Sequence, residues 1–215
     1  MSIKVLIADD HQIVREGLRA LLEKEPWVTV VGEAQEGRTT LRLARELVPD
    51  VILMDVAMPD LNGIEATRQI VAELPGVKVI ALSMHSDKRF VLNMFKAGAK
   101  GYLLKDCAFT HLIKAIRVVA ANKTYLSEDI ADIVVKDYIM GPTLAEDSTG
   151  EQLTAREREV LQLVVEGKST NQIADCLHVS IKTVESHRHQ IMLKLNIKSI
   201  AELTKYAIRA GITSP

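Results

Sequence analysis

Five polar side chains close short apolar runs of the sequence, where they could carry out chemistry. Asp9 and Asp10 follow VLIA, Asp55 follows VILM, Ser83 ends IALS and Lys105 follows GYLL. Three carboxylates brought together repel one another strongly unless a cation joins them, and hard oxygen ligands suit Mg²⁺. A lysine, a hydroxyl and a metal ion around a carboxylate would neutralise a phosphoryl group, which makes Asp55 a candidate nucleophile.

Each of these residues alone has an ordinary structural explanation. An aspartate before a helix is commonly an N-cap, a serine after a strand usually belongs to a turn, and a lysine is usually solvated. Their order along the chain favours a site, because each one closes a run with the length of a strand. In open parallel sheets, ligands collect at the carboxyl ends of the strands. We therefore expect all five side chains at one edge of a sheet.

The first 125 residues alternate apolar runs with amphipathic stretches, and this alternation predicts how the five residues are positioned. Helical periodicity is seen, for example, in residues 14–24 and 38–47. The alternation predicts a parallel sheet with helices on both faces, and near-continuous apolar runs such as VILM indicate strands buried on both sides. The predicted strands cover residues 4–8, 29–34, 51–54, 78–83 and 101–104.

Length and composition bound the class of protein. The chain has 215 residues, which is long for one core and favours two compact units. Hydrophobic residues make up 47%, but no stretch approaches the ~20 apolar residues of a membrane span, and the N-terminus turns acidic before any long apolar segment. The two cysteines, Cys107 and Cys176, lie far apart. We therefore expect a soluble cytoplasmic protein with reduced thiols.

Charge is distributed unevenly along the chain. Residues 1–150 carry 18 Lys and Arg against 21 Asp and Glu, whereas residues 151–215 carry 9 against 7, together with three histidines. The C-terminal part is therefore mildly basic, which permits a polyanionic partner but does not require one.

A linker separates two differently patterned parts of the chain. After a helix predicted near residues 127–138, the sequence MGPTLAEDSTGEQ interrupts both periodicities with Gly and Pro. Beyond it, four short helices are predicted over residues 155–166, 170–177, 181–195 and 199–210. Their expected N-caps are Thr154, Ser169, Ser180 and Lys198 or Ser199. Thr154 and Glu157 have the spacing of a capping box, and the whole arrangement indicates a helix-turn-helix.

The third of these helices has two distinct faces. Val184, Ile191 and Leu195 share one face, with His187 beside them, and this face is expected to pack inward. The other face carries Lys182, Glu185, Ser186 and His189, flanked by Arg188 and Lys194. Such a face can enter a major groove, with basic groups on phosphates and central groups on base edges. Periodicity alone is equally typical of a solvated face in a small helical bundle.

Residues 3 to about 122 resemble the receiver domain of bacterial response regulators. The resemblance lies in ADDH at 8–11, MDVAMPDLNG at 54–63, ALS at 81–83 and GYLLK at 101–105. It implies a doubly wound, flavodoxin-like α/β fold with five parallel strands in the order 2-1-3-4-5. It also implies that Asp55 accepts a phosphoryl group from a phosphohistidine on a partner sensor histidine kinase.

The same resemblance implies a magnesium site. Asp10 and Asp55 would bind Mg²⁺, Asp9 would act mainly through water, and the main-chain carbonyl of Ala57 would complete the set. In this family, the side chain two residues after the acceptor influences attack by water. Since the alanine at position 57 cannot hold a water, we hypothesise that phospho-Asp55 hydrolyses slowly.

The resemblance further assigns a switch to residues at the neighbouring strand ends. Lys105 would pair with the phosphoryl oxygens, Ser83 would move to hydrogen-bond one of them, and Tyr102 would be the aromatic side chain that repositions with it. Met58 and Pro59 would shape the loop after the acceptor. Gly63 would let the next helix begin.

Residues 151–212 resemble the LuxR-type effector domain of NarL/FixJ-type regulators. The pattern LTAREREVL...G.S...IA..L..S..TV..H...I..KL carries this resemblance. Glu185 stands where some members have a basic residue, so the recognised DNA sequence is not predicted. The resemblance implies base contacts from Glu185, Ser186 and His189 and phosphate contacts from Lys182, Thr183, Arg188 and Lys194.

These features predict a two-component response regulator that acts as a transcription factor. We expect a receiver domain at residues 1–125, a linker at 126–148 and an all-α, four-helix, helix-turn-helix DNA-binding domain at 149–215. The expected partners are a sensor histidine kinase, double-stranded DNA and a second copy of the chain, with no membrane. No enzymatic activity is expected beyond the protein's own phosphotransfer and slow dephosphorylation.

Two other functions remain open from the sequence. A haloacid-dehalogenase-type phosphatase would use an aspartate nucleophile, but it typically has D-x-D after the first strand, which Asp9, Asp10 and His11 do not match. An adaptor regulated by contacts alone would bind DNA without labelling of Asp55.

Overall fold

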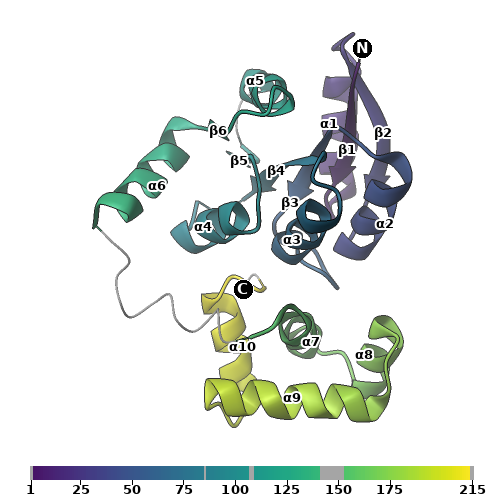
Figure 1. Ribbon diagram of the computed structural model, residues 1–215, viewed down its shortest axis with the longest axis vertical. Helices are drawn as coiled ribbons and strands as arrows, with labels where there is room; N and C mark the ends of the chain where they lie inside the picture. The colour runs from purple at the N-terminus through teal and green to yellow at the C-terminus, as the bar shows by residue number, and fades with distance from the viewer. Residues whose placement is uncertain (1, 85, 107–108, 141–152, 214–215) are drawn as a thin grey trace. The chain divides into compact units, whose positions relative to one another are not determined.

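The computed structural model describes residues 2–84, 86–106, 109–140 and 153–213 (Figure 1). The chain divides into two compact units, Met1–Ile139 and Met140–Pro215, and each has a hydrophobic core of its own. Residues 141–152, which include the Gly- and Pro-bearing end of the predicted linker 126–148, lie outside the described residues, as does Cys107.

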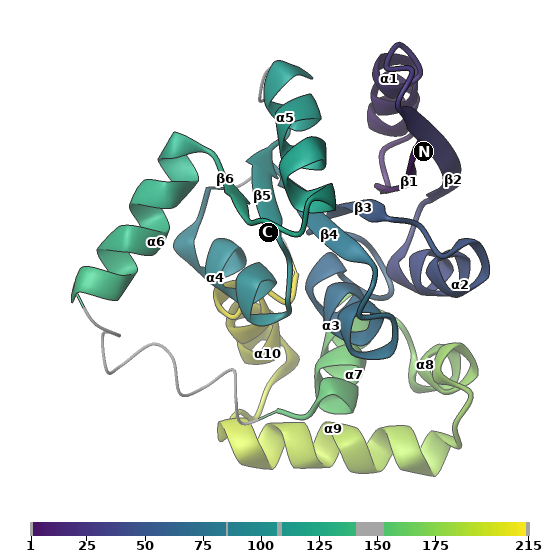
Figure 2. The same ribbon diagram turned by 45° about the horizontal axis from the view of Figure 1, so that its top comes forward.

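A parallel sheet forms the centre of the first unit, in the order β2-β1-β3-β4-β5-β6 (Figure 2). The predicted order 2-1-3-4-5 is confirmed. The predicted number of five strands was one too few, because the two residues of β6 pair in parallel with β5 and extend that edge. A run of two residues is too short to show a period. The strands are β1 (Ile3–Ala8), β2 (Val28–Ala34), β3 (Val51–Asp55), β4 (Lys78–Ser83), β5 (Gly101–Leu104) and β6 (Tyr125–Leu126).

Helices cover both faces of this sheet, as the apolar strands predict (Figure 1). Successive side chains of β1 point to opposite faces: Leu6 belongs to the core under α2, α3 and α4, and Ile7 to the core under α1 and α5. The predicted helix near residues 127–138 is α6, and its Ile130 is buried in the first of these two cores. The helices are α1 (Gln12–Leu22), α2 (Gly37–Leu47), α3 (Gly63–Glu73), α4 (Lys88–Lys96), α5 (Phe109–Ala120) and α6 (Glu128–Met140).

Two glycines allow the loop between β3 and α3 to fold closely around the end of β3. A Cβ atom on Gly63 would overlap the main-chain carbonyl oxygen of Asp55, and a Cβ atom on Gly37 would overlap that of Leu61. Only glycine fits such approaches of backbone to backbone. Gly63 therefore begins α3 directly against Asp55, and α2 supports the same loop from the other side.

The second unit consists of four helices in its described residues, and each begins at a predicted N-cap. They are α7 (Ala155–Val165), α8 (Thr170–Leu177), α9 (Ile181–Leu195) and α10 (Ile200–Arg209). Thr154 and Glu157 form the predicted capping box, and Ser199 rather than Lys198 caps α10. A second capping box, Ser169 with Gln172, was not predicted.

The turn between α8 and α9 follows the pattern of the sequence HVS. His178 adopts a left-handed conformation with φ of 52° and ends α8, and Ser180 caps α9 two residues later. Val184 and Ile191 of α9 are buried in the core of this unit, as predicted from their spacing. Across the described parts of both units, no helix is long and apolar enough to cross a membrane.

Candidate functional site

The carboxyl ends of β1, β3 and β5 bring the predicted acidic and basic side chains together. Lys105 Nζ lies 2.7 Å from Asp9 Oδ2 and 2.8 Å from Asp55 Oδ2. Ligand atoms of Asp9, Asp10, His11 and Asp55 all lie within 4.8 Å of one another. Asp9 and Asp55 are buried, whereas Asp10 and His11 are exposed. The strand ends thus form an acidic cluster, called the acidic pocket below, in which two carboxylates are buried and Asp10 and His11 are exposed.

The electrostatics of this pocket are unbalanced. Burial raises the pKa of Asp55 to about 6, with a contribution from the charge of Asp9, although Lys105 and the amide of Ala57 act in the opposite direction. Burial lowers the pKa of Lys105, but its hydrogen bonds to Asp55 and Asp9 outweigh this effect and leave that pKa above its ordinary value. Lys105 is therefore a fixed cation shared by two buried carboxylates, and it cannot neutralise both.

Ser83 and Tyr102 lie at the neighbouring strand ends and are both buried. Burial raises the pKa of the Tyr102 hydroxyl to about 12, and a side-chain hydrogen bond with Ser83 opposes this shift. The amide of Lys105 donates to the main-chain carbonyl of Ser83 at 2.8 Å, which ties the end of β5 to the end of β4. The two predicted switch residues are therefore in contact with each other, and Ser83 is tied through its main chain to Lys105.

Ala57 lies in the loop after β3. Its amide donates to Asp55 Oδ1 at 3.3 Å, so the loop that would supply a main-chain carbonyl to the site also positions the carboxylate. The amide of Gly63 also donates to the carbonyl of Val56, at 3.0 Å. The backbone of the loop thus folds back on the end of β3.

Two residues of this site were not assigned a role from the sequence. The amide of His11 donates to Asp9 Oδ1 at 2.9 Å, and its Nδ1 lies 2.7 Å from Asp10 Oδ1. Arg15, only 6% exposed, donates from Nη1 to the main-chain carbonyl of Asp9 at 2.7 Å. Their positions in the sequence could have indicated that both lie near the site, because α1 begins directly after the end of β1.

The donor set of the pocket fits Mg²⁺. Three carboxylates supply hard oxygen ligands, and the exposed rim at Asp10 leaves room for the waters that Mg²⁺ retains. One lysine does not balance the charge of three carboxylates, and a divalent cation would offset the remaining charge.

The second candidate site is the outer face of α9. Lys182, Glu185, Ser186 and His189 are exposed, as predicted, while Val184 and Ile191 are buried on the opposite face. Thr183 is half-buried, and its hydroxyl lies 2.8 Å from that of Ser180. The four exposed polar residues therefore lie along one side of the helix from its first turn to just past its middle.

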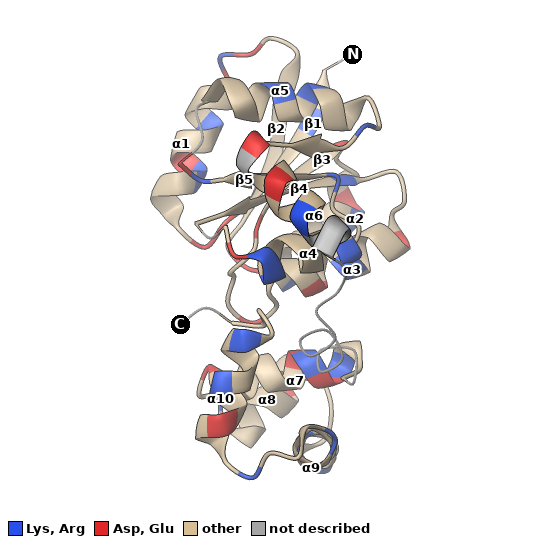
Figure 3. Ribbon diagram, turned by 90° about the vertical axis from the view of Figure 1, so that its left-hand side faces the viewer, with Lys and Arg blue, Asp and Glu red and all other residues tan. Residues whose placement is uncertain are grey.

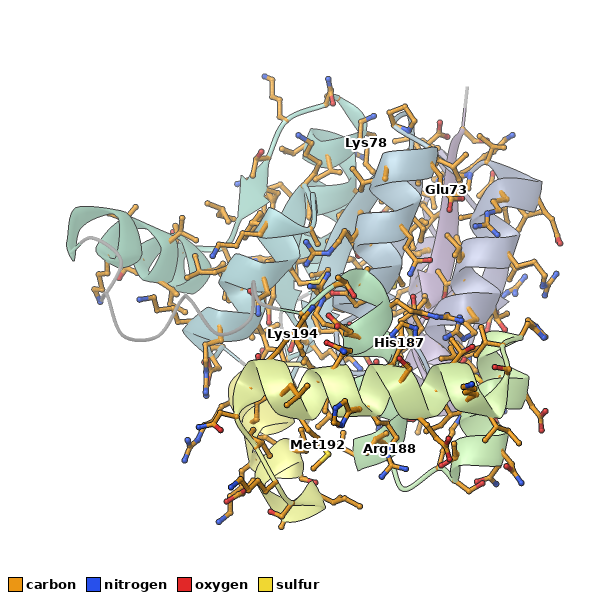
Figure 4. All side chains as sticks on the ribbon, turned by 60° about the horizontal axis from the view of Figure 1, so that its bottom comes forward. Glu73, Lys78, His187, Arg188, Met192 and Lys194 are labelled. Atoms are coloured by element: carbon orange, nitrogen blue, oxygen red, sulfur yellow. The ribbon has the colours of Figure 1, made fainter. Side chains whose placement is uncertain are left out.

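Two of the predicted phosphate-binding residues have partners within the second unit. Lys194 Nζ donates to Glu157 Oε2 of α7 at 2.7 Å, and Arg188 Nη1 donates to Thr170 Oγ1 of α8 at 3.2 Å. Figure 4 shows His187 and Lys194 on one side of the α9 axis and Arg188 and Met192 on the other. Arg188 and Lys194 thus tie α9 to α8 and α7.

Glu157 of α7 accepts hydrogen bonds both from the N-cap residue of its own helix, Thr154, and from Lys194 of α9. Burial acts to raise the pKa of Glu157, but hydrogen bonds from Lys194 and Thr154 outweigh it and hold this pKa below its ordinary value. The same carboxylate accepts from the amide of Thr154 at 2.7 Å and closes the capping box of α7. Acidic residues also lie among the basic ones on α7 and α10 (Figure 3), so positive charge is not concentrated on these two helices.

Comparisons with known families match the two parts of the chain that contain these candidate sites. Residues 5–117 match the response regulator receiver domain, and residues 151–207 match the luxR family of bacterial regulatory proteins. The chain is a NarL/FixJ-type response regulator. In this response regulator, the acidic pocket lies in the receiver domain and α9 lies in the luxR-type domain.

Similar proteins cover nearly the whole response regulator. The transcriptional regulatory protein DegU of Brevibacillus brevis is 37% identical over 223 residues, which span 98% of this chain and 94% of DegU. The response regulator UvrY of Escherichia coli K12 is 39% identical over 210 residues, which span 98% of this chain and 95% of UvrY. This response regulator is accordingly a transcription regulator with a luxR-type DNA-binding domain, in a family that is not enzymatic.

Solved structures show the same architecture. The RcsB response regulator of Salmonella typhimurium has a TM-score of 0.58 and 30% identity, covering 95% of this chain and 97% of that chain. A complex of RcsB with DNA has a TM-score of 0.61 and 29% identity, covering 97% of this chain and 99% of that chain.

Proposed function

We propose that Asp55 is the phosphoacceptor of this response regulator and that its phosphoryl group comes from a phosphohistidine on a partner sensor histidine kinase. The observation that carries this proposal is the place of the Asp55 carboxylate, at the end of β3 and 2.8 Å from Lys105 Nζ. A carboxylate in this place has a cation beside it and lies next to the exposed Asp10, with ligand atoms within 4.8 Å of each other. These are the requirements of a nucleophile that must meet an anionic donor.

The transfer requires one bond to form and one to break. An Asp55 carboxylate oxygen attacks phosphorus, the bond from phosphorus to the donor imidazole breaks, and the electron pair leaves with the imidazole nitrogen. Lys105 balances charge on the carboxylate before transfer and on the phosphoryl oxygens after it. Asp9, Asp10, Asp55 and the main-chain carbonyl of Ala57 would hold Mg²⁺, which supplies further charge neutralisation.

Phosphorylation of Asp55 would change the hydrogen bonds of residues on the neighbouring strands β4 and β5. Ser83 exchanges its hydrogen bond with Tyr102 for one to a phosphoryl oxygen, and Tyr102 repositions as a result. These residues lie on β4 and β5, next to α4 and α5, so the surface formed by α4, β5 and α5 would change and favour a homodimer. Structures of RcsB dimers on DNA support such an assembly in this family.

DNA binding would follow from the outer face of α9. Glu185, Ser186 and His189 contact base edges, and Lys182 and Thr183 contact phosphates at the start of the helix. Arg188 and Lys194 also contact phosphates, and to do so they exchange their present partners, Thr170 and Glu157.

The phosphoacceptor is tested with acetyl phosphate and Mg²⁺, comparing the wild type with Asp55→Asn. We expect the wild type to gain the mass of one phosphoryl group, and the variant to gain none. Asp106→Asn is the matched control, because Asp106 is exposed and adjacent to Lys105 but not part of the acidic cluster. Equal labelling of wild type and Asp55→Asn would refute the proposal, and rapid turnover of a generic phosphoester would favour a phosphatase.

The control of DNA binding by phosphorylation is tested on the same proteins. Light scattering measures dimer formation, and a gel-shift assay with duplex DNA measures DNA affinity. Phosphorylated wild type is expected to dimerise and to bind more tightly, and Asp55→Asn is expected to do neither. The logarithm of the DNA association constant falls linearly with the logarithm of the salt concentration. Lys182→Ala should make this slope less steep by about 0.9 if Lys182 contacts one phosphate, whereas Lys205→Ala on α10 should leave the slope unchanged. Undiminished DNA binding without labelling of Asp55 would favour an adaptor.

A further inference from the structure

We propose that Arg15 is a positioning residue for the cation site, because it fixes the peptide bond between two of the carboxylates that would bind Mg²⁺, Asp9 and Asp10. This inference rests on the proposed function, in which these two carboxylates and Asp55 hold a divalent cation. It assigns a role to a buried side chain outside the acidic pocket. Arg15 acts through the two aspartates, since a guanidinium has no lone pair to offer a metal ion.

Arg15 is buried although it is charged. It lies in the second turn of α1, whereas Arg19, four residues further along the same helix, is exposed. Charged side chains are rarely buried unless they are paired, because taking a guanidinium out of water costs free energy. The contacts that Arg15 makes inside the protein must therefore offset this cost.

The strongest of these contacts is to the main chain at the end of β1. Arg15 Nη1 donates to the main-chain carbonyl of Asp9 at 2.7 Å. This carbonyl belongs to the peptide bond that joins Asp9 to Asp10, and the plane of a peptide bond contains the Cα atoms of both residues. A hydrogen bond to the carbonyl therefore fixes the orientation of the plane from which both carboxylates extend.

Asp9 and Asp10 differ in how they are supported. The amide of Asp9 donates to the carbonyl of Ala34 in β2 at 3.1 Å, so Asp9 continues the pairing of the sheet. Asp10 lies beyond the strand and is exposed, and its carboxylate lies 2.7 Å from the side chain of His11, which is exposed as well. The direction of Asp10 thus depends mainly on the backbone before it, which is the part that Arg15 holds.

Arg15 is itself held by β2. Its Nε lies 3.6 Å from Oε2 of Glu33, and Arg19 Nη1 lies 2.6 Å from the other oxygen of that carboxylate. The guanidinium therefore bridges β2 and the end of β1, which a planar group with several fixed donors does better than a flexible ammonium group. If Arg15 were removed, Glu33 would keep Arg19 as its partner.

Positioning and charge predict opposite effects on Mg²⁺ binding. If Arg15 acted through its positive charge alone, its removal would strengthen the binding of a dication to the acidic pocket. If it acts through the peptide bond between Asp9 and Asp10, its removal weakens binding, because residues that orient metal ligands commonly change the affinity by about 10- to 100-fold. A contribution to stability alone would leave the Mg²⁺ affinity of the folded protein unchanged. The sign of the change therefore separates the three roles.

The experiment uses full-length protein and titration calorimetry with Mg²⁺. Arg15→Met keeps an unbranched apolar stem and is expected to weaken Mg²⁺ binding about tenfold. Arg19→Met is the matched control, because Arg19 also pairs with Glu33 but is exposed, and it should change the affinity less than about twofold. Urea denaturation verifies that both variants are folded. An affinity that is unchanged or stronger in folded Arg15→Met would overturn the inference.

An NMR measurement tests the hydrogen bond in the wild type, so it does not depend on the folding of a variant. A scalar coupling across the hydrogen bond, between a guanidinium nitrogen of Arg15 and the carbonyl carbon of Asp9, should be present in metal-free and in Mg²⁺-loaded protein. Its absence from either state would overturn the inference. In metal-free Arg15→Met the amide resonance of Asp10 should shift, and in Arg19→Met it should not.

Acetyl phosphate separates a failure of this inference from a failure of the proposed function. In Arg15→Met the Mg²⁺ concentration for half-maximal labelling of Asp55 should rise about tenfold, as for binding, and the maximal rate should change less. If the wild type binds no Mg²⁺ or is not labelled at Asp55, the proposed function fails. If the wild type behaves as expected and Arg15→Met matches it, only the inference about Arg15 fails.

Discussion

Asp55→Asn should stabilise the metal-free protein at neutral pH. Burial raises the pKa of Asp55 from 3.8 to about 6, so keeping this carboxylate charged in the folded state is unfavourable. Each pKa unit is worth about 1.36 kcal/mol, so the penalty approaches about 3 kcal/mol above pH 6. Asparagine has nearly the same shape without the charge, and Lys105 keeps Asp9 as its partner.

The pH dependence of this effect has a definite sign. Between pH 3.8 and about 6 the folded protein retains a proton on Asp55 that the unfolded chain has released. The free energy of unfolding contributed by this group therefore falls as pH rises through that window. Below pH 3.8 both states are protonated, so the difference between wild type and Asp55→Asn should vanish.

The assay is urea denaturation in EDTA at pH 4 and pH 8, followed by tryptophan fluorescence. Trp27 is the only tryptophan of the chain and is half-buried in the first unit under the guanidinium of Arg117, 4.4 Å from the ring centre. The signal therefore reports the receiver domain alone. Added Mg²⁺ should narrow the gap at pH 8, because it stabilises the wild type through a carboxylate that the variant lacks.

Two results would refute this reasoning. One is an Asp55→Asn variant that is less stable than wild type at pH 8 in EDTA, because burial of the charge would then not be the dominant effect. The other is a difference of the same size at pH 4 and pH 8. Asp106→Asn is the control, since this exposed carboxylate should have little effect at either pH.

Three further predictions concern other parts of the protein. Gly63→Ala should destabilise the receiver domain by about 1–3 kcal/mol in the same assay, whereas Gly17→Ala in α1, where a Cβ meets open space, should stabilise it by about 0.5–1 kcal/mol. Glu157→Gln should lower the free energy of unfolding of the second unit by about 1 kcal/mol at neutral pH, measured as faster amide exchange in α7. The hydrogen bonds that lower the pKa of Glu157 stabilise only its charged form, so the difference between variant and wild type should disappear as pH falls and Glu157 becomes protonated. Phospho-Asp55 should persist for minutes or longer because Ala57 cannot hold a water, and Ala57→Asn should shorten its lifetime; loss of phosphate from wild type within seconds would contradict this prediction.

The sequence predicted the strand ends because the relevant signals are local. An apolar run that closes with Asp55 or Lys105 defines both the strand and the position of the polar group, and parallel order then brings the groups to one edge. The N-caps of α7 to α10 were predictable for the same reason, since a Ser or Thr before a periodic stretch satisfies free amides whatever the surroundings.

The features that the sequence did not predict depend on distant partners or on tertiary burial. Lys194 was assigned to DNA phosphates from its place beside the outer face of α9, but its present partner Glu157 lies 37 residues away in the sequence. A charged arginine on a helix is normally expected in solvent. Arg15 is nevertheless buried, and its guanidinium donates a hydrogen bond to the main-chain carbonyl of Asp9. The strand β6 exists only because β5 provides an edge to pair with.

The charge imbalance of the pocket links its stability to its proposed chemistry. Lys105 is shared between two buried carboxylates, and Asp10 adds a third at the rim, so the metal-free pocket carries excess negative charge. This excess contributes to the raised pKa of Asp55, and a phosphoryl group would increase it further. In the proposed transfer to Asp55, a cation bound by Oδ1 of Asp9 and Oδ1 of Asp55, the oxygens away from Lys105, would offset this charge. Substitutions that remove one of these carboxylates should accordingly weaken Mg²⁺ binding and phosphoryl acceptance together, whereas substitutions on the outer face of α9 should change DNA binding alone.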